Sequence, residues 1–225
     1  MGNIAEELTE SLGSKEVFTI GSISINEAVV VTWIIMAVIL ILCIVLTKNL
    51  KIKDVGKRQA FLEFGYQWAL DFFDGLVGKN GRPFIPYLIT VLIYLGFANI
   101  IGLFGFAPPT KDLNVTAGLA IASIIVVEYA GIKHRGFKGW MKSFTEPVAI
   151  ITPLNILEIF IRPLSLCMRL FGNMLGGYII LKLVEAVAPV IIPLPLNFYF
   201  DIFDGLLQAY VFAFLTSLYI SEAVE

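Results

Sequence analysis

Five long apolar segments limit what this chain can fold into more than any other feature. They cover residues 28–47, 83–106, 115–132, 148–192 and 196–220. A helix needs about 20 apolar residues to cross roughly 30 Å of hydrocarbon, and the first segment provides them without a single charge. The segments predict an all-α membrane protein, a single multi-pass domain over residues 1–225, with about five membrane-crossing helices.

The composition agrees with burial in lipid. Hydrophobic residues make up 58% of the chain and charged residues 15%, whereas a soluble domain carries about a quarter charged residues. The formal net charge of −2 gives no indication of nucleic-acid binding. Cys43 and Cys167 lie inside apolar segments, so we expect two small hydrophobic side chains and no disulfide framework or metal site. We expect no cofactor.

Two further segments are amphipathic. Residues 61–77 (FLEFGYQWALDFFDGLV) mix aromatic and aliphatic side chains with Glu63, Asp71 and Asp74, which makes them too charged to cross a bilayer. This pattern predicts a helix that lies at the membrane interface. Residues 137–144 predict a second, shorter piece of the same kind.

The distribution of basic residues predicts the orientation of the chain, because cytoplasmic loops are enriched in Lys and Arg. The segment before the first crossing holds only Lys15 and the loop after the second only Lys111. We therefore expect residues 1–26 outside and the C-terminus in the cytoplasm. Eleven basic residues then face the cytoplasm: Lys48, Lys51, Lys53, Lys57, Arg58, Lys79, Arg82, Lys133, Arg135, Lys138 and Lys142.

The fourth apolar segment contains several charged residues, among them Glu158, Arg162 and Arg169. A basic residue at the centre of a bilayer costs about 2.5–3.5 kcal/mol on insertion scales, so such residues indicate function. Glu158 and Arg162 are four residues apart and can pair within one helix. For these two residues, a structural ion pair and a role in transport are equally compatible with the pattern.

Arg169 differs, because no acidic residue lies within one helical turn of it. An unpaired arginine on a face with small residues implies that a partner chain supplies the carboxylate. A helical stripe with steps of three or four contains Glu158, Arg162, Ser165, Arg169, Asn173 and Gly176.

A second polar stripe follows the last apolar segment: Asp201, Asp204 or Gly205, Gln208, Phe212 and Thr216. Gln208 is expected either to bond with Arg169 or to line a water-filled path. Asp201 lies nearer the outer end and is either an interfacial charge or part of that path. Asn99, in GFANIIGLFG, is a further candidate to line the path on the outer side.

Two motifs resemble the F-type ATP synthase subunit a family. Residues 162–174 match R-P-x-S-L-x-x-R-L-F-G-N-M, and residues 206–221 (LLQAYVFAFLTSLYIS) are similar to that family's final helix. The resemblance implies that the last two helices are long and tilted, form an ion-path hairpin over residues 148–222, and curve against a ring of c subunits. It also implies b subunits of a peripheral stalk as partners and a bacterial-type cell membrane as the location.

The resemblance also implies roles for single residues. Arg169 matches the family's essential arginine, Asn173 the asparagine that follows it, and Gln208 the glutamine of the last helix. Many members carry Glu or His nine residues after the arginine, where this chain has Tyr178. Many carry His or an acid seven residues before the glutamine, where it has Asp201. The outer relay is therefore expected to depend on Asp201, with Asn99 and Tyr178 as further candidates.

The function implied is that of a stator subunit with two half-channels, which passes protons or sodium ions to and from the c-ring and couples their flow to ATP synthesis. The subunit itself is not an enzyme, although the whole complex is an H⁺-transporting two-sector ATPase. Two alternatives remain at this point. One is a secondary ion or anion transporter with a midplane site at Arg169, and the other is a membrane scaffold; the sequence shows no internal repeat that would favour the transporter.

Overall fold

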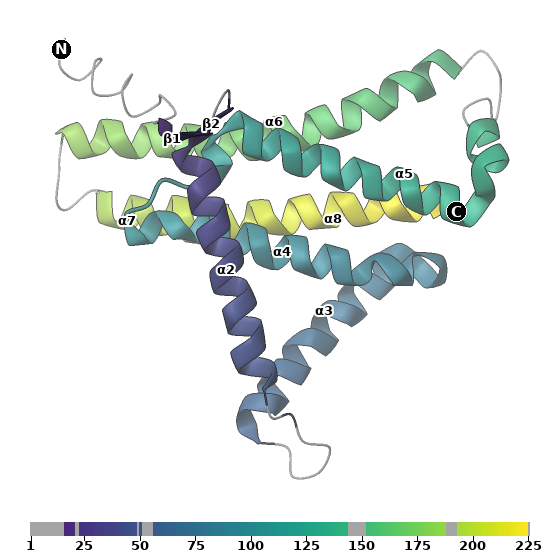
Figure 1. The fold of residues 1–225 in the computed structure, drawn as a ribbon, viewed down its shortest axis with the longest axis horizontal. Coiled ribbons are helices and arrows are strands. Elements are labelled where there is room, and N and C mark those ends of the chain that lie inside the picture. Colours follow the sequence, from purple (N-terminus) through teal and green to yellow (C-terminus); the bar gives the residue numbers. More distant parts are fainter. Residues whose placement is uncertain are drawn as a thin grey trace.

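The computed structural model describes residues 16–20, 23–48, 50, 56–143, 152–187 and 193–224, and the chain is all-α apart from one short pair of antiparallel strands (Figure 1). The strands β1 (Glu16–Ile20) and β2 (Ile23–Asn26) precede the first helix. The helices are α2 (Glu27–Thr47), α3 (Lys57–Gly81), α4 (Ile85–Ile100), α5 (Leu113–Ser143), α6 (Thr152–Val187), α7 (Pro193–Asn197) and α8 (Gly205–Val224). Short 3₁₀ turns η1 (Arg82–Phe84), η2 (Ile101–Phe104) and η3 (Pro109–Lys111) join them, and a π-helical turn η5 (Phe198–Asp204) leads into α8.

Five helical stretches among the described residues are long and apolar enough to cross a membrane. They are Glu27–Thr47, Lys57–Phe104, Leu113–Lys142, Thr152–Ala186 and Pro193–Val224. Each contains one of the five apolar segments, or most of it, so the predicted class, an all-α membrane protein with about five crossings, is confirmed. The second stretch also includes α3, which contains the segment predicted to lie at the interface.

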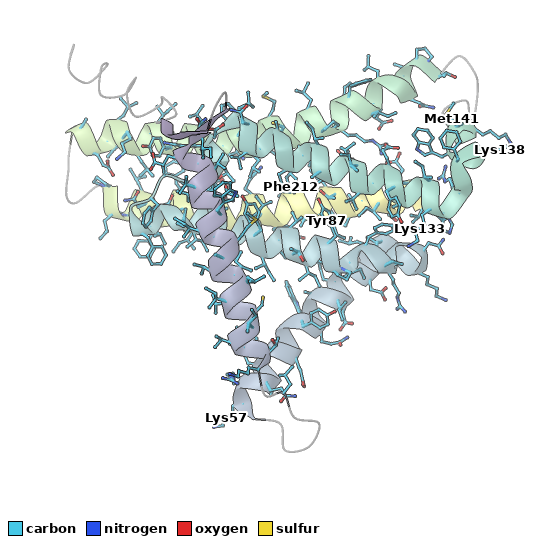
Figure 2. All side chains as sticks on the ribbon, in the orientation of Figure 1. Lys57, Tyr87, Lys133, Lys138, Met141 and Phe212 are labelled. Carbon is cyan, nitrogen blue, oxygen red and sulfur yellow. The ribbon has the colours of Figure 1, made fainter. Side chains whose placement is uncertain are left out.

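Helix α8 lies at the centre of the packing. It contacts α4, α5 and α3, while α6 packs mainly against α5. In Figure 1, α4, α5, α6 and α8 run side by side and α2 crosses them. The core contains Phe73 of α3, Leu88 of α4 and Phe212 and Ile220 of α8, each less than 2% exposed. Figure 2 shows Phe212 and Tyr87 within this packed region.

The outer faces of the helices are strongly apolar. On α2, Trp33, Leu40 and Ile44 are all more than half exposed, and Cys43 is exposed as well. Large exposed apolar patches on a soluble monomer are uncommon, and here they match a surface that contacts hydrocarbon. On α3, Phe61 and Phe64 are more than 70% exposed although Phe73 on the opposite face is buried. Residues 61–77 are thus helical with one side buried in the bundle, and their position at the membrane interface stays a prediction.

Helix α5 changes direction at Gly136, whose φ of 72° and ψ of 160° are essentially accessible only to glycine. The seven residues after it, 137–143, form a separate short helical piece, which confirms most of the second predicted amphipathic segment. Phe144, its last predicted residue, lies outside the described residues. Trp140 of this piece donates from Nε1 to Oε2 of Glu128 over 2.7 Å and so holds the piece against α5.

Helix α6 is too long for an upright crossing. Its 36 residues extend over about 54 Å at 1.5 Å per residue, compared with roughly 30 Å of hydrocarbon. Helix α2, with 21 residues and about 31 Å, matches that thickness when upright. Because α6 lies across α2 in Figure 1, the length and the arrangement both agree with a tilted α6.

Candidate functional site

Arg169 lies in the middle of α6 and its side chain is exposed on the outside of the helical bundle. It forms no hydrogen bond or ion pair with any residue that the structure describes. The neighbouring Leu166 and Leu170 are buried, so an adjoining face of α6 holds the helix in the bundle. This geometry agrees with the sequence interpretation that no carboxylate of the same chain neutralises Arg169.

One turn after Arg169, a hydrogen bond joins α6 to α8. Nδ2 of Asn173 donates to Oε1 of Gln208 over 2.8 Å. Gln208 is only 2% exposed, whereas Asn173 is exposed on the same side as Arg169. Gln208 thus bonds with Asn173, and within the described part of the chain it has no bond with Arg169.

Toward the start of α6, Arg162 takes part in two ion pairs. Its Nη2 lies 2.9 Å from Oε1 of Glu158 and 2.7 Å from Oε1 of Glu222, while its guanidinium stacks 4.9 Å from the centre of the Tyr219 ring. The predicted pairing of Glu158 with Arg162 is confirmed. Glu222 was not predicted as a site residue. Its position as an acid in the last turn of an apolar helix was the one sequence feature that could have indicated it.

A cavity of about 260 Å³ opens beside this cluster. Arg135 lies at its wall and donates from Nη2 to the backbone oxygen of Glu222 over 3.1 Å. The lining is markedly polar and includes Glu128, Arg135, Trp140, Asn155, Glu158, Arg162 and Glu222.

A larger cavity, of about 390 Å³, lies at the other end of the α6–α8 pair. The ring of Tyr178 lies 4.2 Å from Nζ of Lys111 and 5.8 Å from Nζ of Lys182, which in turn pairs with Glu185 at 2.7 Å. The candidate residues Asn173, Tyr178 and Asp201 thus share one space. Its polar lining consists of Glu27, Lys111, Asn173, Tyr178, Lys182, Glu185, Asn197, Asp201 and Asp204.

Asn99 is completely buried and holds α4 against the start of α8. Its Nδ2 donates to the backbone oxygen of Gly205 over 2.8 Å, and its Oδ1 accepts from Oγ1 of Thr110 over 2.9 Å. It is not among the residues that line the larger cavity, so its place in the structure is an anchor next to the cavity. Thr110 was not predicted, because nothing in the local pattern distinguishes it from other loop threonines.

Asp201 lies in the π-helical turn η5 and is 7% exposed. Its carboxylate faces the larger cavity and has no hydrogen bond to another described residue. π-helical turns within α-helices are rare and occur frequently at functional sites. Asp204, the last residue of the turn, lines the same cavity.

The two cavities are separated along both helices. On α6, Glu158 and Arg162 precede Arg169, and Tyr178 follows it. On α8 and the preceding turn, Asp201 lies at one end and Glu222 at the other. Between the cavities, the α6–α8 pair carries Arg169 and the bond from Asn173 to Gln208.

Comparison with known proteins gives a consistent result. The sequence model of the family described as ATP synthase A chain matches residues 29–221. ATP synthase subunit a 2 of Bradyrhizobium sp. is 40% identical over 214 residues, which cover 95% of each chain. ATP synthase subunit a of Moorella thermoacetica is 34% identical over 93% of this chain and 96% of its own. The sodium ion specific subunit a of Propionigenium modestum is 34% identical over 89% of this chain and 74% of its own.

Proposed function

The chain belongs to the ATP synthase A chain family, and from this premise we propose that it forms the stationary ion pathway of a rotary ATP synthase. In this role it provides two half-channels, one from each side of the membrane. Protons, or sodium ions as in the name of the Propionigenium relative, pass through them to and from a ring of c subunits. The subunit is not catalytic, and the complex to which it belongs makes or hydrolyses ATP.

The observation that carries the proposal is the exposed Arg169, which pairs with no described residue and lies between two polar cavities. A charged group that faces the outside of a membrane helix requires a counter-charge, because an isolated charge in hydrocarbon is costly. A carboxylate of a c subunit that passes this face provides the counter-charge. The larger cavity serves as the outer half-channel and the smaller one as the inner half-channel.

In the outer half-channel, Asp201 receives the ion, with Tyr178 and Asn173 along the way to the ring. In the inner half-channel, the ion leaves past Glu158 and Glu222, while Arg162 keeps these two carboxylates in place. Asn99 lies next to the outer half-channel and stabilises its wall through its bonds to the backbone of Gly205 and to Thr110.

The physical chemistry of the cycle follows from the cost of burying charge. A c-ring carboxylate that has bound its ion is neutral and can face lipid, whereas the bare carboxylate cannot. The positive charge of Arg169 favours the ionised carboxylate and so drives ion release. Arginine does not deprotonate in proteins, so its charge persists and repels a cation that would leak directly between the half-channels. The membrane potential supplies about 2.3 kcal/mol per charge per 100 mV.

The proposed orientation places the N-terminus outside and the C-terminus in the cytoplasm of a bacterial-type cell. Lys133 and Lys138 lie at the end of the bundle where α8 finishes (Figure 2), and Arg135 bonds with the last turn of α8. At the opposite end, Nδ2 of Asn26 donates to Oδ2 of Asp112 over 3.4 Å, which brings the N-terminal strands next to the loop after α4. Lys133, Arg135 and Lys138 thus lie together at one end of the bundle, which supports a cytoplasmic position for that end.

The proposed surface for the c-ring is the exposed face of α6. Arg169 and Asn173 lie on it, Gln208 supports Asn173 from within, and apolar side chains such as Met168 surround them. The b subunits of the peripheral stalk bind elsewhere on the chain.

Site-specific crosslinking tests the proposed surface. A photoreactive group on a cysteine at Met168, which is 46% exposed, should link to a c subunit in the intact complex. The matched control is a cysteine at Leu40, which is 62% exposed and lies on α2, the helix that crosses the bundle (Figure 1). Both positions require a Cys43→Ser background. Links to c subunits from Leu40 and none from Met168 would contradict the proposal.

A further inference from the structure

The end of α4 and the start of α8 approach each other more closely than side chains normally allow. A methyl group at Gly102 would lie 2.6 Å from Oδ2 and 2.7 Å from Cγ and Oδ1 of Asp201. Methyl carbons essentially never come closer than 3.0 Å to a heavy atom in proteins. The observed position of the Asp201 carboxylate is therefore compatible only with glycine at residue 102.

A second close contact fixes the register of this approach. A methyl group at Gly205 would lie 2.9 Å from Cβ of Asn99, and Asn99 donates its hydrogen bond to the backbone oxygen of the same glycine. The chain segments run in opposite directions, so the pairing of Asn99 with Gly205 places Gly102 opposite Asp201. The bond from Thr110 to Asn99 holds the amide in the required orientation.

Hydrogen bonds do not hold the carboxylate of Asp201. It is 7% exposed, it faces the outer cavity, and no described residue donates to it. The carboxylate projects from the π-helical turn η5 and lies close to the backbone of Gly102. This contact limits the position of the carboxylate on the cavity wall. Contact with a bare backbone leaves both carboxylate oxygens available to an incoming ion or to water.

We propose that Gly102 is a positioning residue of the outer half-channel, which sets where the Asp201 carboxylate receives the coupling ion. This inference depends on the proposed function, in which Asp201 lies on the ion path. A methyl group at residue 102 has to be accommodated at an ordinary separation of about 3.5 Å, so it displaces the carboxylate by about 1 Å. A misplacement of about 1 Å can slow a reaction that depends on position by about 100-fold.

The test compares Gly102→Ala with Gly96→Ala in the intact ATP synthase. Gly96 lies on α4, which leads into the turn η2 that contains Gly102. It is buried, and a methyl group there would meet Cδ2 of Leu206 at an ordinary 3.7 Å. ATP synthesis is measured in inverted vesicles while the lumenal pH is varied, or the lumenal sodium concentration where sodium is required. We expect Gly102→Ala to slow synthesis about tenfold or more and to change the dependence on the lumenal ion. Gly96→Ala should behave as wild type.

A double-mutant cycle shows whether the effect passes through Asp201. In an Asp201→Asn background, where the carboxylate is already lost, Gly102→Ala should cause no further slowing. Equal slowing in both backgrounds would overturn the inference, as would a Gly102→Ala enzyme that matches Gly96→Ala in rate and in ion dependence.

Two further outcomes have a defined meaning. If Gly102→Ala prevents assembly, the double variant Gly102→Ala/Asp201→Ala should restore it, and failure to do so would overturn the inference. If Arg169→Ala abolishes synthesis while Gly102→Ala and Gly96→Ala behave alike, the positioning role fails and the proposed function stands. Retained pumping by Arg169→Ala would contradict the proposed function itself.

Discussion

Replacement of Asn99 by leucine should strongly destabilise the protein, although asparagine is a small residue. Asn99 is 0% exposed and takes part in two hydrogen bonds, to the backbone oxygen of Gly205 and from the hydroxyl of Thr110. Leucine has the same branched side chain of four heavy atoms with somewhat larger methyl groups, so Asn99→Leu removes both bonds without opening a cavity.

The expected loss follows from these two bonds. Hydrogen bonds between side chains in membrane proteins contribute about 0.6 kcal/mol on average and about 1.7 kcal/mol at most. A buried polar group left without its partner costs about 1–3 kcal/mol, and here the Thr110 hydroxyl is left. The total is about 2–4 kcal/mol. At about 2–4 °C per kcal/mol for a chain of this size, the melting temperature should fall by about 4–16 °C.

The assay is thermal unfolding of the purified protein in detergent, with Thr90→Val as the matched control. Thr90 lies on the same helix and is exposed, and it bonds only with the carbonyl oxygen of Pro86 one turn earlier. Thr110→Val, which removes one of the two bonds of Asn99, should lie between the control and Asn99→Leu. If Asn99→Leu unfolds at the same temperature as Thr90→Val, the anchor that defines the register of α4 and α8 does not exist.

Three further expectations concern the site and the bend of α5. Asp201→Asn should slow ion translocation without uncoupling it, and unchanged ion flux in vesicles would remove Asp201 from the path. Gly136→Ala should lower the melting temperature by several degrees, because its φ of 72° and ψ of 160° cost a non-glycine residue about 1–3 kcal/mol; an unchanged melting temperature would mean that the bend is not required. Arg162→Leu should destabilise the protein more than Glu222→Gln, since the arginine side chain is 14% exposed and loses two partners while that of Glu222 is 60% exposed and loses one. Equal melting temperatures for these two variants would contradict the central role of the arginine in this cluster.

The sequence predicted those features of the fold that depend on local patterns. Runs of apolar residues predicted the five crossings, because the length of a helix in lipid is set by the thickness of hydrocarbon. The pairing of Glu158 with Arg162 was predictable from their spacing of four residues on one helix. The absence of an acid within one turn of Arg169 predicted that it has no ion pair on α6, and it pairs with none of the described residues.

The remaining features depend on contacts between segments far apart in the chain. Glu222 reaches Arg162 from 60 residues away, and Asn99 reaches Gly205 from 106 residues away. No periodic pattern in the sequence encodes such a pairing. The π-helical turn that contains Asp201 was likewise not predicted, and it packs against α4 and η2, which lie about 100 residues earlier in the chain.

The close approach at Gly102 illustrates the same limit. In the sequence, this glycine is one of 19 and lies in an apolar segment where small residues are common. Only the antiparallel register of α4 and α8 places it opposite a carboxylate. The charged and polar residues of the site were therefore recognisable from the sequence, whereas the residues that hold them in position were not.

The central claim is that Arg169 separates the two half-channels and forces the c-ring carboxylate to release its ion. The most direct measurement is ATP-driven ion pumping in inverted vesicles, wild type beside Arg169→Ala, with and without sodium. We expect an assembled Arg169→Ala complex that does not pump, and the same loss for Arg169→Lys, because a desolvated lysine can give up its proton. Undiminished pumping by an assembled Arg169→Ala complex would contradict it.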